Sequence, residues 1–144
     1  MRRILPLLAL SLLLALPSLA GAHTRKGKPP PPAPGTLEVS GGRGVIMLKI
    51  RGSLIGSVQR GRVVIAEKGS GEPEIQTGKN IRFRAVDGEY RILVRGVGID
   101  LSASGRGQVT LAAEKRGDTG KFSLNGGDPQ PLPRKATKLK LSAP

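Results

Sequence analysis

Residues 80–111 read NIRFRAVDGEYRILVRGVGIDLSASGRGQVTL, and this stretch decides the fold class. Apolar and polar side chains alternate through most of it, and glycine, serine or aspartate interrupts it at short intervals. Alternation with a period of two residues is typical of β-strands that bury one face. The stretch therefore predicts four short antiparallel strands joined by tight turns.

Asp87 and Gly88 stand at the centre of this stretch. An Asp-Gly pair between two alternating runs favours a two-residue hairpin turn, because both turn positions need a positive φ. Such a turn sets Arg84 directly opposite Arg91. It also predicts a face that can enter a core, made of Ile81, Phe83, Ala85, Tyr90, Ile92 and Val94.

The opposite face of this predicted hairpin carries four basic side chains together with Val86 and Leu93. Like charges across a strand pair destabilise it. One interpretation is that these side chains extend into water or meet acids on a neighbouring strand. The other is a basic patch that binds an anion, and the candidate residues for that site are Arg82, Arg84, Arg91 and Arg95.

The remaining chain predicts more short strands. Glycine (21 residues) and proline (12) are abundant, a composition that suits strands and turns better than helices. We expect an all-β fold, either a small antiparallel β-sandwich or a partly open barrel of about seven to nine short strands, in a single domain over residues 36–142. Further strand candidates are Val45–Arg51, Ser53–Gln59, Arg62–Glu67, Lys121–Leu124 and Thr137–Leu141.

A weak internal repeat links two parts of the chain. Ile50-Arg51-Gly52 is followed by Arg60-Gly61 and the strand candidate from Arg62, and Val94-Arg95-Gly96 is similarly followed by Arg106-Gly107-Gln108. Two related β units would produce this pattern. Chance would also produce it, because arginine and glycine are common in this chain.

Residues 1–22 have the features of a signal peptide. Two arginines precede a leucine-rich apolar run over residues 4–16, and Ala20 and Ala22 form a small-residue cleavage site with the cut expected before His23. The alternative is an uncleaved membrane anchor, but prolines interrupt the run and it is shorter than a spanning helix. We expect an exported protein (periplasmic, cell-wall associated or secreted) with no transmembrane span after cleavage.

Residues 23–35 form a basic, proline-rich linker that favours the extended polyproline II conformation. The whole chain has a formal net charge of +14. Such a charge favours polyanions, and the candidates are nucleic acid, anionic lipid headgroups and acidic cell-surface polymers. Of these, an anionic cell-surface polymer is the expected partner. Export and the predicted core position of Phe83 and Tyr90 argue against nucleic acid, since single-strand binding needs exposed aromatic rings. The charge could also serve solubility alone.

Catalysis has little support in the sequence. There is no cysteine, the only histidine is His23 in the linker, and no metal-ligand cluster or nucleophile motif is present, so we expect no cofactor and no metal site. The sequence favours a non-catalytic module of the cell envelope or the extracellular space, structural or binding. The alternatives are a polyanion-binding protein and a small hydrolase with acidic catalysts, for example Asp100 with Glu67.

The order of several short motifs over residues 42–141 resembles that of small exported bacterial β-domain proteins with no known activity. This resemblance implies that the tail belongs to the domain as its final strand, and it implies no activity. The motifs that carry it are Gly-Arg-Gly-Val (42–45), Arg-Phe-Arg (82–84), Tyr-Arg-Ile-Leu-Val-Arg-Gly-x-Gly-Ile-Asp-Leu-Ser-Ala (90–103), Gly-Arg-Gly-x-Val-Thr-Leu (105–111), Asp-Thr-Gly (118–120), Asn-Gly-Gly (125–127) and Pro-Leu-Pro (131–133).

Overall fold

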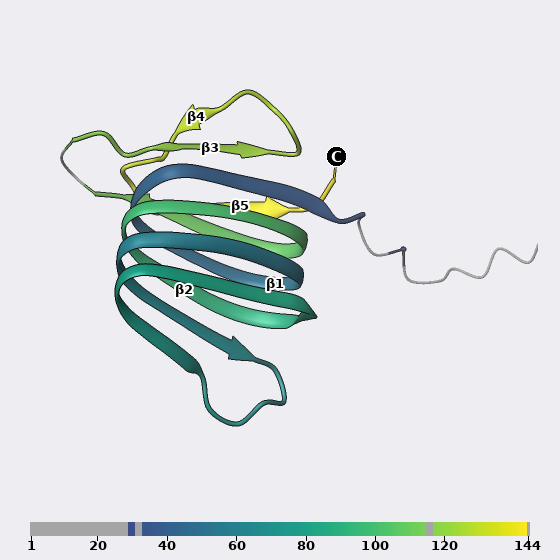
Figure 1. Cartoon of the computed structure of the whole chain (residues 1–144). Helices are drawn as coiled ribbons and strands as arrows, with labels where there is room; N and C mark the ends of the chain where they lie inside the picture. The colour runs from purple at the N-terminus through teal and green to yellow at the C-terminus, as the bar shows by residue number, and fades with distance from the viewer. Residues whose placement is uncertain (1–28, 31–32, 115–116, 144) are drawn as a thin grey trace, which may run out of the picture. The chain divides into compact units, whose positions relative to one another are not determined.

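The computed structural model describes residues 29–30, 33–114 and 117–143, and these contain strands but no helix (Figure 1). The predicted all-β class is therefore confirmed. The strands form one curled antiparallel sheet in the order β4-β3-β1-β2-β5. Their bounds are Gly35–Glu67 (β1), Glu74–Ala113 (β2), Lys121–Leu124 (β3), Gln130–Pro131 (β4) and Thr137–Leu141 (β5). The predicted signal peptide and its cleavage residues Ala20 and Ala22 lie outside the described residues.

Two very long strands replace most of the short strands that the sequence predicts. β1 has 33 residues and β2 has 40, and they pair with each other in two registers at once. Ile46, for example, pairs with Val94 on one side and with Leu111, 17 residues further along β2, on the other. The antiparallel ribbon of β1 and β2 is thus wound into a coil in which each turn is hydrogen-bonded to the next (Figure 1).

Glycines stand where the ribbon bends. Gly61 pairs with both Gly78 and Gly96, and Gly96 also pairs with Gly44, so one row of glycines crosses neighbouring strand sections. A Cβ atom at Gly96 would overlap the carbonyl oxygen of Arg60 and lie 2.9 Å from Cα of Gly61. Only glycine allows this close approach of two backbones. A second row, on the other side of the coil, contains Gly35, Gly105, Gly52 and Gly88.

The two glycine rows account for three of the four glycines in the Arg-Gly repeat. Gly52 belongs to one row, and Gly61 and Gly96 belong to the other. The predicted strand breaks at Gly52 and Gly61 are therefore bends within β1 and not turns between strands. The repeated sequences also do not form two separate units, because the two halves of the ribbon interleave around one coil.

The bends divide the coil into two walls on either side of the core. Each wall is made of alternating β1 and β2 sections, with β3 or β5 added at one edge. We call them the serine wall, which contains residues 35–43, 53–60, 79–87 and 97–104, and the basic wall, which contains residues 44–52, 61–67, 74–78, 88–96 and 105–113. Every second residue of most sections faces the interior, so both walls contribute to one core.

The core contains the side chains that the alternation predicts. Ile81, Phe83, Ala85, Ile92 and Val94 are buried, and Tyr90 packs against them half-buried. The predicted core face is therefore confirmed. The other fully buried large side chains are Leu37, Ile46, Leu48, Ile50, Val58, Val63, Ile99, Val109, Leu111 and Leu141.

The predicted hairpin at Asp87-Gly88 is wrong. β2 continues through these residues, with Gly88 opposite Gly52 and Ala85 opposite Leu54. Two residues of β2, Val86 and Asp87, therefore stand opposite the single residue Ser53, which is the geometry of a β-bulge. Asp87 has φ 41°, so the Asp-Gly signal for positive φ was real, but it serves a bulge at a bend.

Hydrogen bonds between Ser53 and Asp87 hold this bulge. The Asp87 backbone N–H donates to Ser53 Oγ at 3.0 Å, and the Ser53 hydroxyl donates to Asp87 Oδ1 at 3.2 Å. Replacing Ser53 with alanine removes both bonds, and we expect the free energy of unfolding to fall by about 1 kcal/mol. Urea denaturation measures this. Ser40→Ala, at an exposed serine on the same wall, is the control, and an equal loss in both variants would contradict the role of the bulge.

The C-terminal strands complete the sheet. β3 pairs with the start of β1 (Leu37 opposite Leu124), and β5 pairs with the end of β2 (Val109 opposite Leu139). Leu141 at the end of β5 is buried. The tail is therefore the final strand of the domain, as the sequence predicts.

Candidate anion-binding surface

The four arginines proposed as an anion site do not share one face. All four are exposed, but Arg82 and Arg84 lie on the serine wall, while Arg91 and Arg95 lie on the basic wall. The bulge at Asp87 separates the two pairs. Arg84 stands opposite Ile55 and not opposite Arg91, so the predicted repulsion between these two arginines is absent.

The serine wall carries charges of both signs, with five basic and three acidic residues. Its outer side contains a shallow groove of about 690 Å³ whose lining includes Arg82 and Arg84 as well as two acids, Glu38 and Asp100. Serines and Gly56 form much of the remaining lining. One carboxylate oxygen of Asp100 already has a hydrogen-bond partner, since its Oδ1 accepts a hydrogen bond from the Gly41 backbone N–H at 2.9 Å. A polyanion would meet both signs of charge here.

The basic wall brings cations together across neighbouring strands. Three like-charged pairs are formed by residues that stand directly opposite each other, namely Lys49 with Arg91, Arg62 with Arg95, and Arg51 with Arg106. Lys138 and Lys140 of β5 extend the same wall beside Thr110 and Gln108. The result is a broad surface of positive charge.

Acids neutralise little of this charge. In the described part of the chain, Lys49, Arg62, Arg91 and Arg95 form no ion pair. Like charges directly opposite each other destabilise a strand pair by a few tenths to about 1 kcal/mol. Two of the pairs, Lys49–Arg91 and Arg62–Arg95, thus keep their repulsion, whereas Arg51 of the third pair forms an ion pair with Glu89. An anionic ligand placed between the members of each pair would convert this repulsion into attraction.

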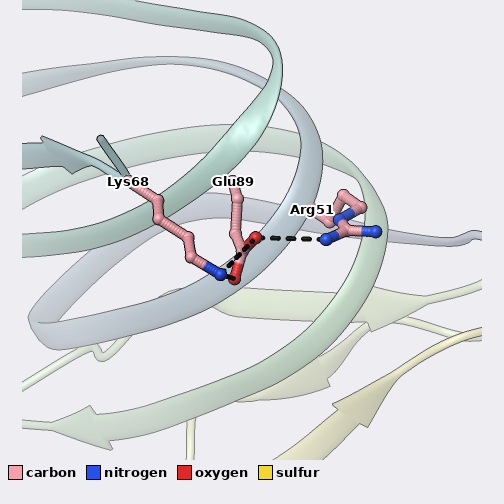
Figure 2. A network of polar contacts seen from close by, with 3 residues as sticks. All are labelled: Arg51, Lys68 and Glu89. Carbon is pink, nitrogen blue, oxygen red and sulfur yellow. Dashed lines mark hydrogen bonds and ion pairs between the residues drawn. The ribbon is translucent and has the colours of Figure 1, made fainter. Parts of the chain in front are cut away.

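Glu89 is an acid of the basic wall that forms ion pairs with neighbouring cations (Figure 2). Its carboxylate accepts a hydrogen bond from Arg51 Nη2 at 3.1 Å and lies 3.4 Å from Lys68 Nζ. These three residues line a groove of about 760 Å³ that also includes Lys49, Arg91 and Arg106. Glu89 therefore competes with any anion for the cations around this groove.

The hydrogen bonds from Arg51 and then Lys68 hold the pKa of Glu89 below its ordinary value of 4.5. A carboxyl group whose pKa is lowered by folding stabilises the fold above its unfolded pKa, and that contribution disappears as the pH falls through the folded value. We therefore expect the Glu89 contribution to be complete at neutral pH and lost only in the acid range below about 4.5. Urea denaturation of wild type and Glu89→Gln across this range measures it. A difference that persists at pH 2 would contradict this assignment.

Replacing Glu89 with glutamine removes the competing carboxylate at neutral pH. We expect affinity for an acidic polymer to rise about two- to fivefold, because Arg51 and Lys68 become available. Titration at low salt measures this change. Glu38→Gln removes the same charge from the serine wall, and an equal gain in that variant would show that net charge alone determines binding.

The acids proposed for a hydrolase are not brought together. Asp100 stands opposite Ser57 on the serine wall, whereas Glu67 stands opposite Tyr90 on the basic wall. Within the described residues, no group of three or more His, Cys, Asp or Glu side chains is placed to hold a metal ion. In that same part of the chain, no helix has the length and apolar character needed to cross a bilayer.

Sequence reasoning missed four of the six basic residues in the β1 and β2 sections of the basic wall. Lys49, Arg51, Arg62 and Arg106 were not among the candidates, although each is a basic residue at an outward position of an alternating strand. That outward position could be read from the sequence. Their pairing with Arg91 and Arg95 could not, because it depends on how the ribbon is wound.

Comparisons of the chain with protein-family models, with curated proteins and with solved structures find no match. The function is therefore argued from the geometry of the basic wall.

Proposed function

We propose that this chain is an exported, non-catalytic module that binds anionic polymers of the cell surface through its basic wall. The observation that carries the proposal is the set of three like-charged pairs across neighbouring strands, Lys49–Arg91, Arg62–Arg95 and Arg51–Arg106. A surface needed only for solubility would gain by alternating these charges with acids. The serine wall has one such pair, Arg60–Lys79, and its groove also contains the acids Glu38 and Asp100. The larger number of like-charged pairs on the basic wall favours a ligand there.

The signal-peptide pattern of residues 1–22 supports export. The position of the aromatic residues supports a polymer other than single-stranded nucleic acid. Phe83 is buried, and Tyr90 and Phe122 pack partly buried against the core, so none offers an open ring for base stacking. In this proposal the two walls act as the layers of a small sandwich, and the outer side of one layer is the binding surface.

The direct test is a titration of the purified exported protein with an acidic polysaccharide at low and at physiological salt. We expect binding that weakens as salt rises, because the screening length for exposed charges shortens to about 8 Å at physiological ionic strength. A neutral polysaccharide of the same length is the control. Absence of binding to the acidic polymer at low salt would overturn the proposal.

A further inference from the structure

The basic wall also carries an apolar stripe, exposed at Met47 and Ile75 and half-buried at Val64 and Leu93, that a polymer of acidic sugars would leave unused. Met47 stands opposite Leu93, Leu93 stands opposite Val64, and Val64 stands opposite Ile75. Met47 is 49% exposed and Ile75 is 51% exposed. Neighbouring strands are about 4.8 Å apart, so the stripe crosses about 14 Å of the wall.

Cations lie on both sides of this stripe. On one side of the stripe, Lys49 and Arg91 lie two residues along their strands from Met47 and Leu93. On the other side, Arg95 and Arg62 lie two residues along their strands from Leu93 and Val64. Successive residues on one face of a strand are about 7 Å apart, so each row of cations runs alongside the apolar row. A groove of about 360 Å³ lies over this region, lined by Met47, Leu93 and Val64 together with Lys49, Arg91 and Lys138.

We infer that the basic wall docks on the anionic surface of a lipid bilayer, with the stripe of Met47, Val64, Ile75 and Leu93 entering the headgroup region. This inference rests on the proposed anion binding by the same wall. Interfacial binding needs apolar side chains for the acyl boundary and cations for the anionic headgroups around them. A single bound fatty acid would need a cation only at one end of the stripe. Cations along both sides match a surface of many headgroups.

The serine wall of the same molecule can be compared with the basic wall. It also exposes an apolar side chain, Ile55 at 58%, but serines and charges of both signs surround it. Because acids as well as arginines lie around Ile55, an anionic surface attracts this region less strongly than it attracts the basic wall. We therefore expect the two walls to respond differently to the same vesicles.

The test is sedimentation of the exported protein with vesicles of phosphatidylcholine containing phosphatidylglycerol, and with vesicles of phosphatidylcholine alone. We expect binding only to the vesicles with phosphatidylglycerol. The variant Met47→Ser/Ile75→Ser keeps every cation and is expected to bind these vesicles about tenfold more weakly, because it lacks the apolar contact. Its binding to the acidic polysaccharide is expected to stay unchanged. Ile55→Ser is expected to bind both like wild type.

A fluorescence measurement checks the contact directly. The chain contains no tryptophan, so Met47→Trp introduces a single reporter. We expect its emission to shift to the blue on anionic vesicles, while that of Ile55→Trp stays unchanged. Equal vesicle binding by wild type and the Met47→Ser/Ile75→Ser variant, or equal shifts from both reporters, would overturn bilayer docking while leaving polymer binding intact. Failure to bind both polymer and vesicles would instead overturn the proposed function.

Discussion

Replacing Lys49, Arg91 and Arg95 together with glutamine is expected to weaken binding to an acidic polysaccharide about thirtyfold at low salt. Each exposed ion pair contributes up to about 1 kcal/mol, and these residues supply members of two of the three like-charged pairs. The same change relieves repulsion between opposite strand positions. We therefore expect the melting temperature to stay equal or rise while affinity falls, which separates a lost site from a lost fold.

The matched control is Arg82→Gln/Arg84→Gln, which removes arginines from the serine wall. These two residues share their groove with Glu38 and Asp100, so their loss is expected to change affinity by about twofold or less. A similar loss of binding in both variants would assign the affinity to net charge. Unchanged binding in the triple variant would assign it to another part of the chain.

Replacing Gly96 with alanine is expected to lower the free energy of unfolding by roughly 3 kcal/mol. The new methyl group would meet the carbonyl oxygen of Arg60 and Cα of Gly61, which belong to the neighbouring turn of the ribbon. Gly96 also has φ 153°, a conformation that side chains rarely adopt. Backbone strain of about 1–3 kcal/mol and overpacking of a similar size both contribute to this loss.

Urea denaturation compares this variant with Gly71→Ala. A Cβ atom at Gly71 has no neighbour within 4 Å, so this second variant is expected to match or slightly exceed wild-type stability. Equal stability of wild type and Gly96→Ala would show that the turns of the coil do not need this close approach, and the winding would have to be revised.

The sequence predicted which side chains face inward because alternation is local information. Ile81, Phe83, Ala85, Ile92 and Val94 all enter the core, and this result does not depend on where each strand ends. The position of the turns was not predictable in this way. Asp87-Gly88 satisfies the backbone of a hairpin turn and of a bulge equally well. Distant partners in β1 decide between them, because pairing through Gly52 and Leu54 keeps both strands continuous.

The candidate site was predicted only in part, for the same reason. Arg91 and Arg95 lie on the basic wall, but Arg82 and Arg84 lie beyond a bend that the hairpin model did not contain. Lys49 and Arg62 were missed because their partners are more than 30 residues away in the sequence. The spacing of the glycines was the one signal in the sequence for how the ribbon is wound. Gly44 and Gly61, like Gly35 and Gly52, are one turn of the ribbon apart.

The most direct test of the central claim is to map backbone amide chemical shifts of the protein during titration with a short acidic oligosaccharide. Binding by the basic wall predicts that the largest changes occur at residues 47–51, 62–66, 89–95 and 106–110, with the serine wall unaffected. Changes concentrated on residues 82–84 and 100–102, or in the basic ends of the chain alone, would contradict it.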